Sequence, residues 1–358
     1  MALLYGRELR GRRLVKSALV ALLGAACLWP AANPRAAAEA EIALGLAREG
    51  KYAQAIPHYQ SALALDRSLP GLPVNLGLAY FKLNRFDEAA AQFDQALKTD
   101  PANFQARVLL GMTEYACRRF AGAATHLKLA AAQQPDNTEL RFKLAQSYLW
   151  SQQYEPAKRE FQILLQQNPD SAPVHMLLGE VLDAANQQEQ ATAELEAAVK
   201  ASPTEAEAHF GLGYLYWKQK RYEEARREFQ SELANQPKHA PALAYLADSE
   251  MRAGDEKAAE GHVRRALALD ANVRLAHLDL GILLAGRNEF EQAASHFREA
   301  IRLDPSKPDA HYRLGRLWLA LGREEEADAE FAKVKALAKE EHPEPLVAVP
   351  GRTPDRPQ

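Results

Sequence analysis

The chain has 358 residues, of which 47% are apolar and 25% are charged, and its formal net charge is −3. A chain this close to neutrality sets up no strong electrostatic field, so nucleic acid and anionic membrane surfaces are not expected partners. The length alone would suggest two or three domains.

The first 38 residues have the layout of a secretory signal peptide. Five basic residues lie within residues 7–16, and the 13 residues that follow, 17–29, carry no charge. A run of small residues then leads to Ala38, where we expect cleavage, so that the mature chain begins near Glu39. The sequence therefore predicts export, to the periplasm or the extracellular side.

Two alternatives to cleavage remain open, and membrane contact is expected only in these cases. Retention as a membrane anchor is less favoured, because a span needs about 20 apolar residues. Lipidation of Cys27 is less favoured because the residues before it, 24–26, lack the aliphatic side chain of a lipoprotein box. After cleavage Cys117 would be the single cysteine, so no intrachain disulfide is expected.

Residues 70–103 contain a pattern that recurs along the chain. With Pro70 as position 1, large apolar residues occupy positions 7, 11 and 24, and small residues occupy positions 8 and 20. Position 20 is alanine in every copy, and position 32 is often proline, which ends a helix. The five defining residues are Leu76, Gly77, Tyr80, Ala89 and Phe93. The nine copies start at residues 36, 70, 104, 138, 172, 206, 240, 274 and 308 and end at Glu341.

This pattern resembles the tetratricopeptide repeat (TPR), a helix–turn–helix unit of 34 residues. The resemblance implies an all-α fold, a right-handed superhelical solenoid of nine repeats spanning residues 39–341. Positions 7, 8 and 11 share one face of the first helix, and positions 20, 24 and 27 share one face of the second. Small residues at 8 and 20 let the two helices approach, and large residues fill the space around them.

The ends of the array depart from the pattern. Pro57 lies inside the second helix of the first repeat, where we expect it to bend or fray the helix. The polar second helix of the ninth repeat is expected to cap the array. Residues 342–358 contain five prolines and are predicted to form a disordered tail.

No cofactor, metal or catalytic site is expected. Eight of the ten histidines recur at position 4 or 23, which is typical of repeat geometry rather than of a metal site. No phosphate-binding loop, nucleophile elbow or zinc-protease motif occurs, so the chain is not expected to be an enzyme. The charged residues fall mostly on solvent-side positions, as Glu88 and Arg227 do. The carboxylate clamp known in the family is matched only by Asn75 and Arg313, which makes it an unlikely device here.

Positions 5, 9 and 12 of the first helices point toward what is the concave groove in this family. In repeats two to nine, 19 of these 24 positions hold apolar or aromatic residues. Packing between neighbouring first helices would cover part of them, but an exposed apolar groove is the favoured interpretation. The candidate partner-binding residues, with Trp150 at position 13, are Leu78, Phe81, Met112, Tyr115, Phe142, Trp150, Phe210, Tyr214 and Trp217.

The function predicted from the sequence is a non-enzymatic scaffold that binds a protein or peptide in this groove. Resemblance in architecture to exported assembly factors suggests a role in assembling a cell-envelope complex. The alternative is an accessory subunit of an exported or membrane enzyme complex, such as a glycosyl transferase or peptidase. An autonomous enzyme is the third possibility.

Overall fold

The computed structural model describes residues 33–341, and this part of the chain contains 18 helices and no strand. It divides into two compact halves, one ending at Ser202 and one starting at Pro203. The N-terminal half contains α3 (Pro34–Arg48), α4 (Tyr52–Leu65), α5 (Leu72–Lys82), α6 (Phe86–Thr99), α7 (Phe104–Ala116), α8 (Phe120–Gln133), α9 (Thr138–Trp150), α10 (Tyr154–Gln167), α11 (Ala172–Ala184) and α12 (Gln188–Ala201). The C-terminal half contains α13 (Ala208–Lys218), α14 (Tyr222–Asn235), α15 (Ala240–Arg252), α16 (Glu256–Leu269), α17 (Arg274–Gly286), α18 (Phe290–Leu303), α19 (Pro308–Ala320) and α20 (Glu324–Glu341).

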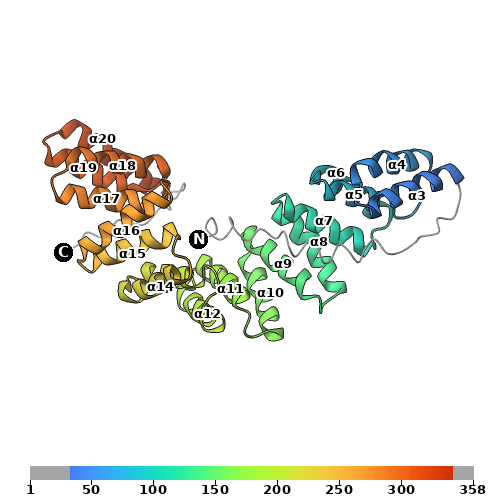
Figure 1. Cartoon of the computed structure of the whole chain (residues 1–358), viewed down its shortest axis with the longest axis horizontal. Helices are drawn as coiled ribbons and strands as arrows, with labels where there is room; N and C mark the ends of the chain where they lie inside the picture. The colour runs from blue at the N-terminus through green and yellow to red at the C-terminus, as the bar shows by residue number, and fades with distance from the viewer. Residues whose placement is uncertain (1–32, 342–358) are drawn as a thin grey trace, which may run out of the picture. The chain divides into compact units, whose positions relative to one another are not determined.

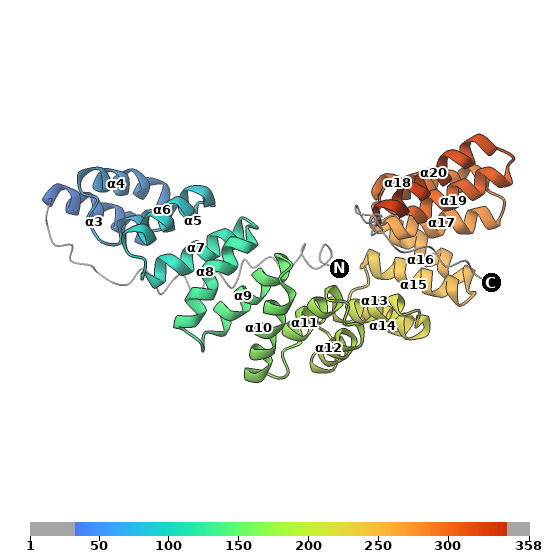
Figure 2. The same cartoon turned by 180° about the vertical axis from the view of Figure 1, so that it is seen from behind.

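Each predicted repeat forms one hairpin of two packed helices, which confirms the all-α solenoid. The hairpins follow one another in chain order within each half, as the colours of Figures 1 and 2 show. Each second helix packs on its own first helix and on the first helix of the next repeat in the same half. One repeat cannot bury its apolar surface alone, so this stacking supplies the core.

The small residues at positions 8 and 20 have the predicted role. A Cβ atom added to Gly77 would lie 2.6 Å from the Phe93 ring, and one added to Gly281 would lie 2.6 Å from the Phe297 ring. The alanine at position 20, for example Ala225, is 0% exposed in all nine repeats. The first and second helices of a repeat therefore touch at these positions, and a larger side chain has no room.

A left-handed residue at position 15 closes the turn inside every repeat. Its φ lies between 59° and 87°. Glycine and asparagine adopt this conformation readily, and they occupy six of the nine copies. The sequence pattern did not indicate this turn, because arginine, glutamine and lysine hold the position in the other three. The nine residues are Gly50, Asn84, Arg118, Gln152, Asn186, Lys220, Gly254, Asn288 and Gly322.

The recurring histidines hold the two helices of a repeat together. At position 4, His175 places its Nδ1 atom 2.6 Å from Oε2 of Glu194, the residue at position 23 of the same repeat. Its Nε2 atom lies 2.8 Å from the carbonyl oxygen of Pro169, at position 32 of the preceding repeat. His209 and His311 make the same bond to the glutamate at position 23 of their repeats. These histidines thus have structural partners.

The first repeat begins before the predicted cleavage position. Asn33 caps α3 through its side chain, and Ala36 is fully buried. A cut after Ala38 would remove both residues, while residues 1–32 of the predicted signal peptide lie outside the described part. The helix α4 runs without interruption through Pro57, so the expected fraying does not occur.

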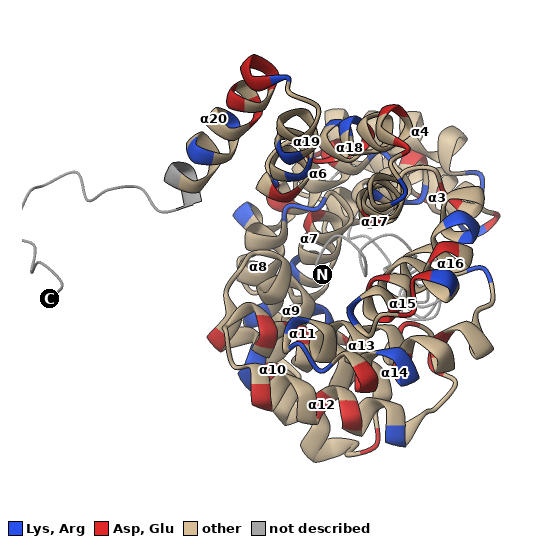
Figure 3. Ribbon diagram, turned by 90° about the vertical axis from the view of Figure 1, so that its left-hand side faces the viewer, with Lys and Arg blue, Asp and Glu red and all other residues tan. Residues whose placement is uncertain are grey.

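The last repeat ends in α20, whose first turn is acidic, as its red residues in Figure 3 show. The predicted tail, residues 342–358, lies outside the described residues. Between residues 33 and 341, no helix combines the length and apolarity needed to cross a membrane.

Candidate protein-binding face of the first helices

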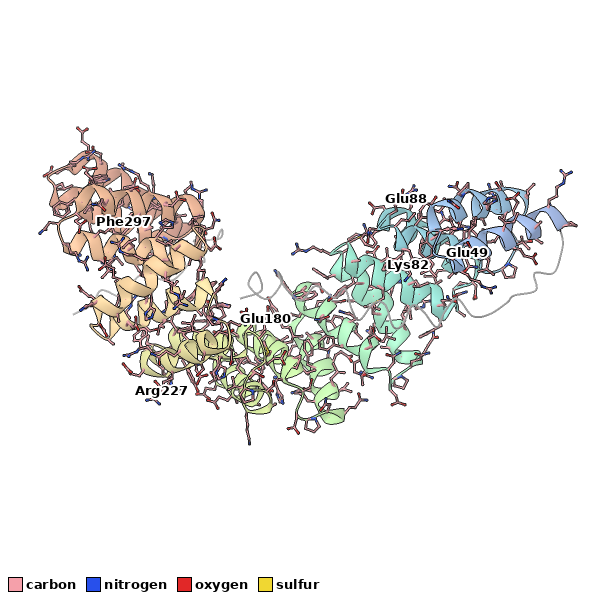
Figure 4. All side chains as sticks on the ribbon, viewed as in Figure 1. Glu49, Lys82, Glu88, Glu180, Arg227 and Phe297 are labelled. Atoms are coloured by element: carbon pink, nitrogen blue, oxygen red, sulfur yellow. The ribbon has the colours of Figure 1, made fainter. Side chains whose placement is uncertain are left out.

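The outer surface and the core lie where the repeat pattern predicts them. Glu88 and Arg227, on the second helices α6 and α14, are exposed, whereas Phe297 is 1% exposed and packs between helices (Figure 4). These two charged residues of the second helices are therefore solvated, as predicted. The remaining candidate surface is the face of the first helices that carries positions 5, 9 and 12.

Two of the nine predicted groove residues lie in the core instead. Leu78 is 2% exposed and Phe210 is 0% exposed. Phe210 is enclosed by rings of the same and the next repeat, with centroid distances of 5.9 Å to Phe229 and 5.8 Å to Tyr245. The expectation that these two side chains line an open groove is wrong for this conformation, because neighbouring helices cover them. The other seven are half-buried: Phe81, Met112, Tyr115, Phe142, Trp150, Tyr214 and Trp217.

Three rings gather in the N-terminal half. Ring centroids are separated by 5.5 Å for Tyr115 and Trp150, 5.7 Å for Tyr115 and Phe120, and 5.0 Å for Phe120 and Trp150. Such edge and tilted contacts are favourable between aromatic side chains. Phe120, at position 17 of the third repeat and the first residue of α8, was missed in the sequence, although Phe86 at the same position packs on Phe81 in the preceding repeat. We call Tyr115, Phe120 and Trp150 the aromatic cluster.

An open pocket of about 650 Å³ borders the aromatic cluster. Phe120 and Trp150 form its apolar wall. Arg119 on its rim pairs with Glu114, at 3.1 Å, and with Asp87, at 2.7 Å. An apolar wall with a charged rim suits an apolar side chain that has polar neighbours, as on a protein or peptide. The pocket is lined by Glu114, Arg118, Arg119, Phe120, Ala121, Gly122, Trp150, Ser151 and Gln152.

Polar side chains missed in the sequence connect neighbouring first helices. The Tyr115 hydroxyl donates to Oε1 of Gln146 at 2.7 Å. The Lys143 ammonium donates to the same oxygen at 3.1 Å and lies 4.5 Å from the centre of the Tyr115 ring. Burial lowers the pKa of Lys143. Position 12 of one repeat is thus tied to positions 6 and 9 of the next, so position 9 is less open than we expected.

The C-terminal half repeats this link with other residues. The Trp217 indole N–H donates to Oδ2 of Asp248 at 2.6 Å, again from position 12 to position 9. Tyr245, at position 6, lies 5.1 Å from the Trp217 ring and 5.4 Å from the Tyr214 ring. The position-9 residues of both links are buried, since Gln146 and Asp248 are each 3% exposed.

A buried carboxylate lies next to this second cluster. Asp279, at position 6 of the eighth repeat on α17, is 0% exposed, and neither of its oxygens has a hydrogen-bond partner among residues 33–341. Burial, followed by the nearby charge of Asp248, raises the pKa of Asp279 well above its usual value. An unpaired buried carboxylate destabilises a fold unless it is protonated.

One group in the described residues places three ligand-type atoms close together, namely Glu207, Glu232 and His239. Glu232 is fully buried where most repeats have alanine, and its Oε2 accepts the Phe210 backbone N–H at 3.1 Å. Nδ1 of His239 accepts the Ala242 backbone N–H at 3.0 Å, so its Nε2 carries a proton and donates to Glu207 at 2.9 Å. A metal would need a lone pair on Nε2, so this arrangement caps α13 and α15 rather than presenting a ligand set.

Comparison with known proteins identifies the repeat. A family model described as "Tetratricopeptide repeat" matches residues 74–138, 182–240, 210–274 and 278–341. A second model with that description matches residues 114–181, and one described as "TPR repeat" matches residues 46–84. No curated protein sequence is significantly similar to the chain.

Solved structures share the fold. The hetero-tetramer Cut9–Hcn1 of the APC/C matches with a TM-score of 0.55 and 16% identity, over 86% of this chain and 61% of that chain. A tetratricopeptide repeat protein from Parabacteroides merdae matches with a TM-score of 0.54 and 17% identity, over 69% of this chain and 97% of that chain. At these identities the likeness concerns the fold alone.

Proposed function

Because the chain belongs to the tetratricopeptide repeat family, we propose that it is a non-enzymatic scaffold that binds a protein or peptide through the aromatic cluster and its pocket. Repeats of this family usually mediate protein–protein interactions. The observation that supports this site is the open pocket of about 650 Å³, whose wall is formed by the half-buried Phe120 and Trp150. Partly exposed tryptophan in a pocket is typical of residues that dominate binding interfaces.

The position of the aromatic cluster also favours binding over a purely structural role. Its rings pack on each other, and Phe120 and Trp150 still border the pocket. A bound apolar side chain would complete the burial of these rings and release water from them. The paired Arg119 on the rim would give orientation to polar groups of the partner.

The proposal includes export and a role in assembling a cell-envelope complex. Its support is the basic start and the uncharged run of residues 17–29. The alternative, an accessory subunit of an exported or membrane enzyme complex, uses the same site for a different partner. Mass spectrometry of the native protein tests cleavage of the predicted signal peptide, because intact residues 1–38 on the purified chain would contradict a mature chain that begins near Glu39.

Photo-crosslinking in the native host tests the binding site and identifies the partner. We would place p-benzoyl-phenylalanine at position 121, an exposed position lining the pocket, and at position 129, exposed on the same helix α8 but outside the pocket. The proposal predicts one discrete crosslinked polypeptide from position 121 and none from position 129. Equal crosslinking from both positions, or none from either, would contradict it.

A further inference from the structure

The first helix of the last repeat, α19, exposes side chains that earlier repeats cover. Tyr312, at position 5, is 43% exposed, and Leu319, at position 12, is 53% exposed. The corresponding residues of the sixth repeat are Phe210, which is fully buried, and Trp217, which is half-buried. In repeats two to eight every residue at positions 5 and 12 is buried or half-buried. The exposed pair on α19 is therefore specific to the last repeat.

The covered repeats show what kind of element would bury this pair. Phe210 and Trp217 both pack on Tyr245, at position 6 of the next first helix, with ring distances of 5.8 Å and 5.1 Å. Trp217 also bonds to Asp248, at position 9 of that helix. Positions 5 and 12 are thus covered by two residues, spaced by three, on one face of a following helix.

The charge on α19 restricts the partner further. Arg313 and Arg316 are exposed on this helix, and its basic residues are blue in Figure 3. Neither guanidinium forms a salt bridge with a carboxylate between residues 33 and 341, and Arg316 donates a 3.5 Å hydrogen bond to the Tyr312 hydroxyl. Arg316 occupies position 9 of its repeat. The residue at position 9 of the sixth repeat, Tyr214, has its ring centre 5.4 Å from that of Tyr245, at position 6 of the next first helix. A helix packed on α19 would therefore place its position-6 side chain near Arg316.

We propose that α19 is the docking surface for an acidic amphipathic helix of a partner protein, which packs where the first helix of a following repeat would lie. The partner helix presents an acidic side chain to Arg316 and, three residues later, an apolar side chain to Leu319. The acidic side chain lies over Tyr312 and forms a charge-assisted hydrogen bond with the guanidinium of Arg316, and the apolar one covers Leu319. This goes beyond the proposed function, because it uses residues of the C-terminal half and none of the pocket.

A peptide based on α15 provides a defined probe. Its sequence is Ala240–Arg252 with Tyr245→Glu and Asp248→Leu, stapled by a lactam bridge on the opposite face so that the short helix is formed. The control peptide has lysine in place of the new glutamate. Fluorescence anisotropy measures the affinity of each peptide for the full chain. We expect the acidic peptide to bind at least tenfold more tightly than the lysine peptide.

Variants of α19 identify the surface. Leu319→Ala should lower the affinity for the acidic peptide about tenfold, as expected for loss of a central apolar contact. Arg316→Glu should reverse the preference between the two peptides. Leu129→Ala, an equally apolar truncation on α8 with 48% exposure, should leave the affinity unchanged. Thermal melts should stay within a degree or two for all three variants, since each side chain is exposed.

Each contrary result overturns the proposal. Equal affinities for the two peptides would show that Arg316 does not select an acidic partner. An affinity for the acidic peptide that Leu319→Ala leaves unchanged would show that the site lies elsewhere. Binding that appears only after deletion of residues 342–358 would assign the surface to that segment of the chain. Sedimentation showing a dimer that Leu319→Glu dissociates would assign it to a second copy.

Discussion

Trp217 donates its indole N–H to the buried carboxylate of Asp248 across two neighbouring repeats, at 2.6 Å. Tyr115 makes the same connection to Gln146 in the N-terminal half, at 2.7 Å. A polar bond at equivalent repeat positions in both halves shows that the first helices are joined by directional contacts as well as by apolar packing.

We expect Trp217→Phe to cost about 1–3 kcal/mol of unfolding free energy, because Asp248 loses a donor while remaining buried. Denaturant melts followed by circular dichroism measure this loss. Trp150→Phe is the matched control, since it preserves the ring contacts of Trp150 with Tyr115 and Phe120. Equal losses in the two variants would show that the hydrogen bond to Asp248 adds nothing to stability.

The repeat frame could be predicted from the sequence because it depends on size alone. Alanine at position 20 and glycine or alanine at position 8 mark helix contacts that leave no room for a large side chain, as the Gly77–Phe93 contact shows. The groove residues could be predicted only in part, because burial at positions 5 and 9 depends on the neighbouring repeat. Phe210 is covered by Tyr245, and no property of Phe210 itself indicates this. The tie between Lys143 and Tyr115 likewise joins two repeats and has no local pattern.

Two adjacent residues of α14 test which face of this helix is buried and which is exposed. Ala225→Leu should cost about 1–3 kcal/mol, because Ala225 is fully buried where two helices touch. Glu224→Gln should change stability by less than about 0.5 kcal/mol, since the exposed pair it makes with Arg221 contributes little. Chemical denaturation of both variants gives the comparison. Similar losses would mean that the helix is rotated from the position described.

Asp279 should make the fold less stable as the pH rises. Its pKa in the folded chain is raised by burial, whereas in the unfolded chain it titrates near the usual value of about 3.9. Between these two values the folded state binds more protons, so unfolding free energy is highest at low pH and falls until the folded group has ionised. Asp279→Asn removes this dependence.

The difference in unfolding free energy between Asp279→Asn and the parent chain should therefore depend on pH. We expect the variant to be more stable by about 1–3 kcal/mol at pH 8, and the gain to shrink on acidification toward pH 4. Urea melts across this range measure the difference. A gain of the same size at all pH values would contradict the titration of Asp279.

His277 and His296 face each other in the eighth repeat, with their Nδ1 atoms 2.9 Å apart, where other repeats pair a histidine with glutamate. Burial, followed by the charge of His277, lowers the pKa of His296. A lowered pKa favours the neutral ring, so its stabilising effect is present above about pH 6.5 and is lost as the pH falls through the folded pKa.

Replacing His296 by glutamate should recreate the usual pair. We expect His296→Glu to raise the melting temperature at pH 5.5, where burial beside His277 makes protonation of His296 unfavourable, and to have a smaller effect at pH 8. His126→Glu at the same position of the third repeat is the control, because that repeat has arginine at position 4. A difference in melting temperature between His296→Glu and the parent chain that is the same at pH 8 and pH 5.5 would rule out His296 as the titrating group.

The affinity of the crosslinked partner for Trp150→Ala is the most direct test of the proposed scaffold. With the partner purified, calorimetry compares the parent chain, Trp150→Ala, and Leu129→Ala, whose side chain is 48% exposed on α8 outside the pocket. A binding role predicts at least a thirtyfold loss for Trp150→Ala, about 2 kcal/mol, and an unchanged dissociation constant for Leu129→Ala. Equal affinities for all three chains, with Trp150→Ala shown to be folded, would contradict the binding site.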